Sequence, residues 1–295
     1  EAQVDFGSFE AFENGALKKL HHLILSFPKS NAGFAVATRS ETREALLEGL
    51  VTMFNFIGYV PSAIWFDQMS TAALRSKNER GETKINDFMM RFSMHYGFKV
   101  KLCNPNSGNE KGNVENKVGT VRRNMFVPEP VIDDLTQFNI ELLSKCLETH
   151  KEKHYRFKET IDKLFEEEKT LMIPVNKSPF DTSRNELRRV NKYGLIDFSG
   201  CRYSVSPKYV GQYVTLKVMA DKILMLSKDL TEEITSHPRL FGKGQESINY
   251  INFIDMIKVR PNALKYSGIY SLLPTMWQDY LNSLDKEELK DAFDI

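Results

Sequence analysis

The sequence contains only three cysteines, Cys103, Cys146 and Cys201, and they are far apart. Because there is no CxxC pair or Cys/His zinc spacing, this odd number indicates a reducing compartment rather than a disulfide or zinc scaffold. The sequence also lacks a signal peptide, an apolar run long enough to cross a membrane, and a GxxxxGK[ST] phosphate loop. We therefore expect a cytoplasmic protein without a membrane anchor, and any ATP hydrolysis that it depends on to belong to a partner.

An excess of charge of either sign is also absent. Forty Lys and Arg residues against 39 Asp and Glu residues leave a net charge of +1 over 295 residues. Local basic patches would have to hold a nucleic-acid ligand, since the global field is nearly neutral. The length allows one large core or two to three smaller ones. The chain starts at Glu1 without a methionine, and we interpret it as part of a longer protein whose N-terminal region is missing.

The first part of the chain has the pattern of a mixed α/β domain. Three segments separated by turn signals, QVDFGSFEAF, KKLHHLILSF and GFAVATRS, are expected to form antiparallel strands. A helix with Ser40 as its N-cap and Gly58 at its end precedes the central strand SAIWFD. A helix ending at Gly97, the strand FKVKLC and a helix through about Met125 complete the order. This order predicts a mixed sheet with helices on its faces over residues 1–127.

Three further regions follow in the sequence. Charged, helical sequence after Pro128 predicts a helical connector over residues 128–190. Short alternating strands, with turn signals about every ten residues, predict a small antiparallel β-barrel over residues 191–240. This barrel is a candidate contact for DNA or for a neighbouring subunit. Residues 241–295 are expected to form a C-terminal tail with short helices.

Three acidic residues stand in distinctive settings, and carboxylates brought together hold the hard divalent cations of phosphodiester chemistry. Asp5 lies in QVDFG, and Asp67 follows the apolar run AIWF, where a buried strand reaches the edge at which ligands collect. Taken singly, Asp67 could be a turn or capping residue, and Asp5 could face solvent. For the third position Glu115 competes with Glu110. We favour Glu115, because Gly112 delays the helix and leaves Glu110 in the loop or first turn.

Basic and amide side chains accompany these carboxylates. The segment around Glu115 has a surplus of two positive charges, although a solvated helix would carry similar ones. We predict DNA contacts from Lys111, Asn113, Asn116, Lys117, Arg122 and Arg123. A second basic cluster precedes the barrel and is also a candidate for DNA contact, although a solvated linker would explain it equally well. It comprises Arg184, Arg188, Arg189 and Lys192. His150 and His154 lie four apart, and we expect them on a charged surface helix rather than at a metal.

The segments AQVDFG, IWFDQMSTAAL and NPNSGNEKGNVENKVGTVRRNMF resemble an IstA-type transposase. This family comprises the integrase-core enzymes of insertion sequences that work with an AAA+ ATPase called IstB. The similarity runs in order through about the first 127 residues, and Phe6 and Gln68 depart from the more usual Trp and Asn. The resemblance implies a ribonuclease H-like fold with an Asp-Asp-Glu (DDE) site. In that site Asp5, Asp67 and Glu115 would bind two Mg²⁺ ions, with Mn²⁺ able to substitute.

The resemblance also implies a function. The expected reaction is metal-dependent cleavage at transposon ends, followed by strand transfer of the 3′-hydroxyl into target DNA. Expected partners are transposon-end and target DNA, an IstB-type ATPase, and further copies of the chain that form at least a dimer on DNA. The expected location is the bacterial cytoplasm, at the nucleoid during action on DNA. Two alternatives are a ribonuclease H-fold nuclease that does not join strands, and a catalytically silent DNA-binding scaffold.

Overall fold

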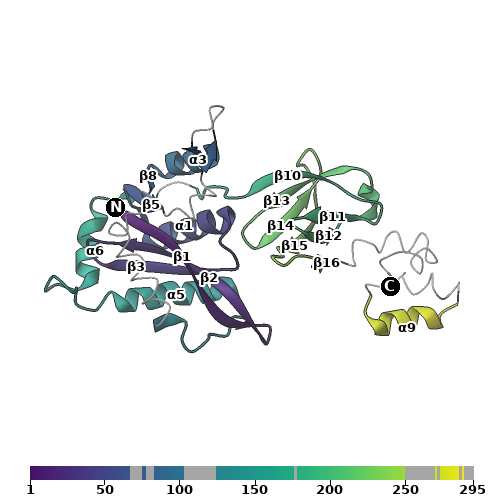
Figure 1. Cartoon of the computed structure of the whole chain (residues 1–295), viewed down its shortest axis with the longest axis horizontal. Coiled ribbons are helices and arrows are strands. Elements are labelled where there is room, and N and C mark those ends of the chain that lie inside the picture. Colours follow the sequence, from purple (N-terminus) through teal and green to yellow (C-terminus); the bar gives the residue numbers. More distant parts are fainter. Residues whose placement is uncertain are drawn as a thin grey trace. The chain divides into compact units, whose positions relative to one another are not determined.

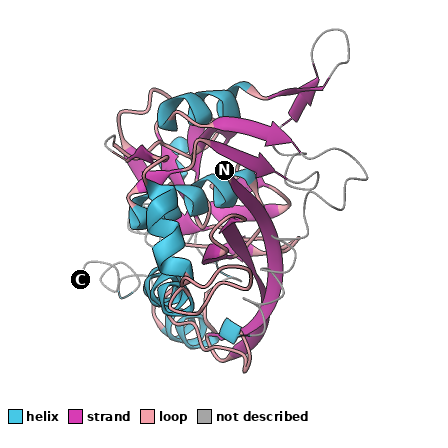
Figure 2. Ribbon diagram, turned by 90° about the vertical axis from the view of Figure 1, so that its left-hand side faces the viewer, coloured by secondary structure: helices cyan, strands magenta, loops and turns pink. Residues whose placement is uncertain are grey.

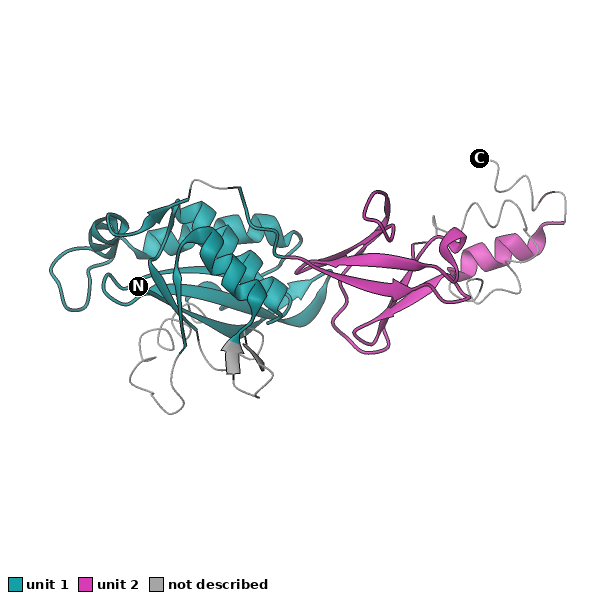
Figure 3. Cartoon of the chain, turned by 90° about the horizontal axis from the view of Figure 1, so that it is seen from above, with its two compact units in different colours: residues 1–182 teal, residues 183–295 magenta. Residues whose placement is uncertain are grey.

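The computed structural model describes residues 1–66, 75–77, 83–102, 124–175, 178–249, 270, 273–285 and 288. The chain divides into two compact units, residues 1–182 and residues 183–295 (Figure 3). The segment 128–190, predicted as a connector, contributes two helices and a two-residue strand to the first unit and one strand to the second. No helix within the described ranges is both long and apolar enough to cross a bilayer.

A five-stranded mixed sheet forms the centre of the first unit (Figure 1). The three strands that come first in the sequence pair antiparallel, as the sequence predicts. Two further strands extend the sheet in parallel, one beside the first strand of the chain and the other beside that added strand. A tight turn joins the first two strands, where Asn14 and Gly15 have φ of 53° and 74°, the left-handed values of a two-residue hairpin loop. In spatial order the strands are β3 (Ala32–Thr38), β2 (Ala16–Phe27), β1 (Ala2–Glu13), β5 (Ala63–Phe66) and β8 (Lys99–Leu102).

Helices cover both faces of this sheet, which confirms the predicted mixed α/β layering (Figure 2). Helix α1 (Arg43–Ile57) packs so tightly on one face that a Cβ on its Gly49 would lie 2.8 Å from the Leu23 side chain. Its fully buried leucines each stabilise the fold by about 1.5–3 kcal/mol relative to exposed ones. The opposite face holds Phe9, on which Phe126 stacks with ring centroids 3.9 Å apart. Phe126 in turn contacts helix α5 (Leu135–Thr149) through Phe138.

The described residues of the first unit form six further elements. They are β4 (Tyr59–Val60), which pairs with β9 (Ile173–Pro174), β6 (Arg75–Lys77), which pairs with β7 (Thr83–Ile85), α3 (Asp87–Tyr96) and α6 (Ile161–Lys169).

The helix ends follow their capping chemistry, with one correction. Gly58 and Gly97 end α1 and α3 with φ of 78° and 81°, as predicted, because glycine adopts the left-handed region without a Cβ clash. The N-cap of α1 is Thr42 rather than Ser40, and the Thr42 side chain accepts a hydrogen bond from the Ala45 amide. Ser40 instead contacts the Thr42 hydroxyl at 3.0 Å. The prediction placed the start two residues early because both hydroxyl residues suit a cap.

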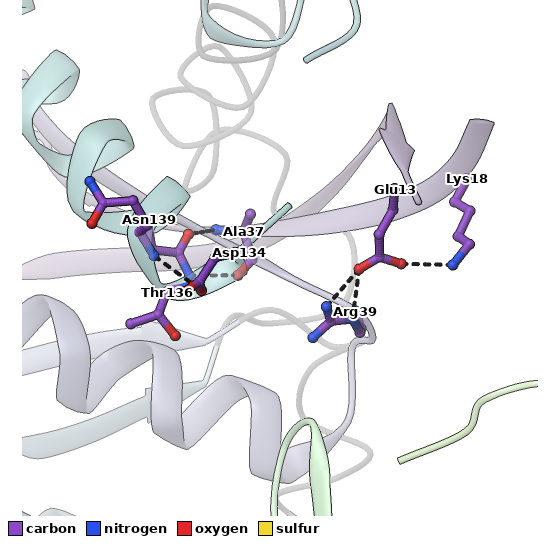
Figure 4. Close-up of polar contacts among 8 residues, drawn as sticks. Glu13, Lys18, Ala37, Arg39, Asp134, Thr136 and Asn139 are labelled. Carbon is purple, nitrogen blue, oxygen red and sulfur yellow. Dashed lines mark hydrogen bonds and ion pairs between the residues drawn. The ribbon is translucent and has the colours of Figure 1, made fainter. Parts of the chain in front are cut away.

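Side chains of α5 cover the outer edge of β3. Asn139 accepts a hydrogen bond from the Ala37 amide at 2.6 Å and donates one to its carbonyl at 3.0 Å (Figure 4). The Nε2 atom of His150 lies 3.1 Å from the Gly33 amide nitrogen and 3.0 Å from its carbonyl oxygen. An uncovered edge strand would offer these groups to another chain, so α5 closes the sheet on this side.

The second unit contains two sheets. No strand pairing within its described residues joins them into a closed barrel, so the predicted barrel is not confirmed. One sheet has the order β10 (Arg184–Arg189), β13 (Tyr213–Val218), β14 (Lys222–Leu226) and β15 (Glu233–Pro238). The other has the order β11 (Leu195–Phe198), β12 (Cys201–Ser204) and β16 (Glu246–Ser247).

His237 of β15 ties the two sheets together. Its Nε2 lies 2.8 Å from the Ser204 carbonyl of β12, and its Nδ1 lies 2.9 Å from the Ser247 hydroxyl of β16. Burial lowers the pKa of this histidine, so the neutral ring donates from Nε2 and accepts at Nδ1. The unit also contains the 3₁₀ helix η1 (Pro207–Tyr209) and helix α9 (Thr275–Ser283), which lies in the segment 241–295.

Candidate active site

Two parallel strands, β5 and β8, end beside β1 in the first unit's sheet. Val4 of β1 pairs with Phe66 of β5, and Phe66 pairs with Leu102 of β8. Phe66 and Leu102 are the last residues of their strands, whereas β1 continues through Asp5. The carboxyl ends of parallel strands are where open α/β sheets bind ligands. This edge is therefore the candidate active site of the unit.

Asp5 lies at this edge on a defined face of the sheet. Its register partner on β2 is Ile24, and its side chain is half-buried. Side chains alternate along a strand, so Asp5 points away from the face that α1 covers, on which its neighbour Phe6 is paired with Leu23. Asp5 Oδ1 accepts a hydrogen bond from the Phe6 amide at 2.9 Å, which fixes the orientation of the carboxylate.

A polar row lies two residues behind Asp5 on the same face. Gln3, Trp65 and Lys101 are paired across the three parallel strands. The Glu1 carboxylate accepts hydrogen bonds from Lys101 Nζ at 2.5 Å and from Trp65 Nε1 at 2.8 Å. These two hydrogen bonds, that of Lys101 first, hold the pKa of Glu1 below its ordinary value. A cleft of about 640 Å³ opens beside the row. This row was not predicted from the sequence, although the two-residue period from Asp5 and Asp67 back to Gln3 and Trp65 could have indicated it.

The other predicted members of the site are not among the residues that the structure describes. They are Asp67, Glu110, Glu115, Lys111, Asn113, Asn116, Lys117, Arg122 and Arg123. Within the described part of the chain, no group of three or more His, Cys, Asp or Glu side chains is placed to hold a metal ion.

The predicted basic cluster of the second unit divides into two kinds of side chain. Glu186 lies between Arg184 and Arg188 on one face of β10 and forms ion pairs with both. Arg189 points to the other face, is exposed, and donates from Nε to the Gly211 carbonyl at 3.1 Å. Lys192 is also exposed, with its ammonium 4.9 Å from the centroid of the Tyr193 ring.

The two histidines expected on a surface helix are buried, and that expectation was wrong. His150 is 2% exposed and His154 is 4% exposed. His150 ends α5 against β3, and His154 Nδ1 accepts hydrogen bonds from the backbone amides of Arg156 and Phe157. Their charged sequence neighbours suggested exposure, but a partner 117 residues away determines the position of His150.

The comparisons with known proteins identify similar chains. The transposase for insertion sequences IS1326/IS1353 of Pseudomonas aeruginosa is 27% identical over 278 residues, which cover 92% of this chain and 54% of that protein. A transposase of Aminobacter aminovorans is 29% identical over 88% of this chain and 52% of its own length. The transposase for insertion sequence element IS21 of Pseudomonas aeruginosa is 27% identical over 81% of this chain and 61% of its own. The chain thus spans about half the length of the curated relatives it matches.

A family model and solved structures also match. Residues 175–249 match the model described as Mu transposase, C-terminal domain. A simian T-cell lymphotropic virus intasome is 16% identical, with a TM-score of 0.42 over 80% of this chain and 75% of that chain. The HTLV-2 integrase catalytic core domain in complex with magnesium is 15% identical, with a TM-score of 0.36 over 55% of this chain and 93% of that one. Structural likeness at this level is too weak to assign a fold or an activity. The sequence relatives are insertion-sequence transposases.

Proposed function

We propose that this chain is the catalytic part of a DNA transposase with a ribonuclease H-like core and a DDE active site. The observation that carries the proposal is the similarity to insertion-sequence transposases along most of the chain. The five-stranded mixed sheet, with helices on both faces and Asp5 where its parallel strands end, supports it. An IstA-type identity, with its separate IstB-type ATPase, is the finer form of this proposal.

The proposal requires the first two carboxylates to lie close to each other. Val4 and Phe66 are neighbours on adjacent parallel strands, which are about 4.8 Å apart. Asp5 and Asp67 each follow by one residue, and consecutive Cα atoms are about 3.8 Å apart. We therefore propose that Asp5 and Asp67 share a cation site. If the pairing of β1 with β5 extended by one residue, both side chains would project from the same face.

The proposal takes the third carboxylate from the segment that follows β8 in the sequence. β8 pairs with β5 through Leu102, and the segment that follows contains Glu110 and Glu115. We assign the third position to Glu115, with Glu110 as its competitor. All three candidates offer oxygen ligands, the donor set that Mg²⁺ and Mn²⁺ prefer. Two such ions, when bound, would activate the nucleophile and stabilise the leaving oxygen of a phosphodiester.

The reaction proposed for this site has two steps. Water first breaks a phosphodiester at the transposon end and leaves a 3′-hydroxyl. That hydroxyl then attacks a phosphorus of the target strand, forms the new ester bond and displaces the target's 3′-oxygen. Asp5, Asp67 and Glu115 would hold the cations, which would supply the charge that positions the scissile phosphate, and no covalent bond to the protein is required. Lys111, Asn113, Asn116, Lys117, Arg122 and Arg123 would bind the DNA beside this centre.

The proposed partners follow from the reaction. Transposon-end DNA and target DNA are the substrates, and pairing of two ends requires at least a dimer on DNA. The proposed location is the bacterial cytoplasm at the nucleoid. A nuclease that does not join strands, and a DNA-binding scaffold without activity, are the competing functions.

A joining assay separates these three functions. The full-length protein is incubated with Mg²⁺, a plasmid target and labelled transposon-end duplexes that already carry a free 3′-hydroxyl. We expect branched joint products from the wild type and a loss of at least a thousandfold in Asp5→Asn and Asp67→Asn, because each variant lacks a cation ligand. DNA binding should change by less than threefold. Asp133→Asn is the matched control, since Asp133 is an exposed aspartate of the same unit.

Each competing function has its own outcome in this assay. Cleavage without joint products in the wild type would favour the nuclease. DNA binding with neither reaction would favour the scaffold. Joint products from Asp67→Asn at the wild-type rate would contradict the assignment of Asp67.

A further inference from the structure

The loop between α5 and α6, residues 150–160, concentrates aromatic and basic side chains on the first unit (Figure 1). Its sequence is HKEKHYRFKET, and the proposed active site makes no use of it. Four basic residues against two acidic ones give the loop a net charge of +2, whereas the whole chain has only +1. The loop therefore carries a local positive field, which the net charge of the whole chain does not indicate.

Backbone hydrogen bonds hold this loop in one conformation. The His154 amide donates to the Glu159 carbonyl at 3.0 Å, and the Ile161 amide donates to the Glu152 carbonyl at 3.0 Å. Inside the loop the buried ring of His154 accepts hydrogen bonds from the Arg156 amide at 3.0 Å and the Phe157 amide at 3.2 Å. A fixed loop loses little conformational entropy when it binds a partner.

Two aromatic side chains project from this fixed loop. Tyr155 is 63% exposed and Phe157 is 49% exposed, values that are high for such apolar groups. Both rings lie against His154, with centroid distances of 4.5 Å and 4.8 Å. The Arg156 guanidinium lies 5.2 Å from the centroid of the Tyr155 ring. The buried histidine thus supports two exposed aromatic side chains with a cation beside them.

Three cations of the loop are available to a ligand. Lys151 forms an ion pair with Glu148 at 2.6 Å and is partly neutralised. Within the described part of the chain, no carboxylate pairs with Lys153, Arg156 or Lys158, and all three side chains are exposed. Aromatic faces beside unpaired cations are the combination with which proteins bind single-stranded nucleic acid, by base stacking and phosphate contact.

We propose that the α5–α6 loop is a binding site for an unpaired DNA strand. Tyr155 and Phe157 stack on bases, and Lys153, Arg156 and Lys158 contact the flanking phosphates. The choice of DNA rests on the proposed function, whereas the site itself is separate from the catalytic carboxylates.

Two sets of substitutions in the full-length protein test this proposal. Binding of a labelled single-stranded oligonucleotide and of a duplex is measured by fluorescence anisotropy between 50 and 300 mM salt. The double variant Tyr155→Ala/Phe157→Ala should bind the single strand about 5- to 50-fold more weakly, with an unchanged salt slope, because stacking involves no counterion release. The triple variant Lys153→Gln/Arg156→Gln/Lys158→Gln should lower the salt slope by about 2–3. Lys145→Gln/Lys163→Gln, on exposed positions of α5 and α6, is the charge control and should change neither quantity.

The outcomes distinguish this site from the proposed function. If the wild type binds both DNAs and the loop variants bind them with the same affinity and salt slope, the loop site is overturned and the transposase proposal stays intact. Weaker self-association of the aromatic variant, with unchanged DNA affinity, would assign the loop to a subunit contact and also overturn the proposal. If the wild type shows no joining activity but the loop variants lose affinity for the single strand, the transposase proposal is refuted and the loop site is retained. The unfolding temperature of each variant is measured as a control, and a value equal to that of the wild type indicates that the substitution leaves the fold unchanged.

Discussion

At the scale of single residues, Glu13 is a buried carboxylate whose pKa is set by two neighbouring cations. This carboxylate is 7% exposed and lies between two cations at the end of the β1–β2 hairpin (Figure 4). It accepts hydrogen bonds from Lys18 Nζ at 2.8 Å and from Arg39 Nη2 at 2.6 Å. Burial alone would raise the pKa of Glu13, but the hydrogen bonds and charges of Lys18 and Arg39 together outweigh it and lower the pKa below 4.5.

This pKa predicts a pH-dependent stability. Because the pKa is lower in the folded state, the stabilisation by Glu13 is present above the ordinary pKa of 4.5 and is lost as the pH falls through the folded value. Glu13→Gln should lower the free energy of unfolding by about 1–2 kcal/mol at pH 7, since solvent screens both partly exposed cations. In urea unfolding, the difference from the wild type should shrink below pH 4.5, with the exposed Glu10→Gln as control. A difference that stays constant from pH 7 to pH 3 would disprove this role.

The residue scale also shows what a sequence can reveal about the site. Asp5 could be singled out by its setting in QVDFG, and the structure places it one residue beyond Val4, the register partner of the last residue of β5. Its role as a cation ligand stays a prediction, as do those of Asp67 and Glu115. The burial of His150 could not be predicted from its neighbours, because it depends on contact with Gly33 of a distant strand.

At the scale of elements, strand β10 changes the interpretation of the second basic cluster. The sequence presents its arginines as one group, but the two-residue period of a strand separates them. Arg184 and Arg188 share a face with Glu186, and their guanidinium groups lie 5.7 Å and 5.9 Å from the centroid of the Phe198 ring. Two positive charges and one negative charge leave that face with a net charge of +1. Arg189 and Lys192 carry two charges without a carboxylate partner among the described residues.

This division predicts unequal contributions to DNA binding. If the cluster contacts phosphates, Arg189→Gln/Lys192→Gln should lower the salt slope of duplex binding by up to about 2. Arg184→Gln/Arg188→Gln should lower it by about 1 or less, because Glu186 already neutralises one of their charges. Slopes measured by anisotropy between 50 and 300 mM salt compare the two pairs, which are matched in size. Equal reductions would show that Glu186 does not shield its neighbours, and two unchanged slopes would remove the cluster from the DNA interface.

Elements with strong local signals were predicted well from the sequence. The first three strands follow from alternating residues bounded by turns such as Asn14–Gly15, and the ends of α1 and α3 follow from Gly58 and Gly97. Closure of a barrel is different, because it requires pairing between distant segments. The parallel pairing of Arg202 with Glu246 adds β16 to β12 over 44 residues, and no local pattern indicates that partner. The strand spacing therefore predicted strands but not the arrangement of their sheets.

At the scale of the whole molecule, the two units have separate cores. Residues of 1–182 build one cluster, around Leu47 and Phe54, and residues of 183–295 build the other, around Tyr203 and Leu216. The sequence relatives extend over both units, whereas the Mu transposase C-terminal model matches residues 175–249. The proposed chemistry requires only the first unit, and the second remains a candidate for DNA or subunit contact.

Mn²⁺ binding to the full-length protein tests the convergence of the three carboxylates most directly. Electron paramagnetic resonance counts bound Mn²⁺ in the wild type and in single variants, without any need for activity. We predict that Asp5→Asn, Asp67→Asn and Glu115→Gln each weaken Mn²⁺ binding by at least tenfold, whereas Glu110→Gln and Asp133→Asn bind like the wild type. Wild-type Mn²⁺ affinity in the variants of Asp5 and Asp67 would contradict a shared cation site at the ends of the parallel strands.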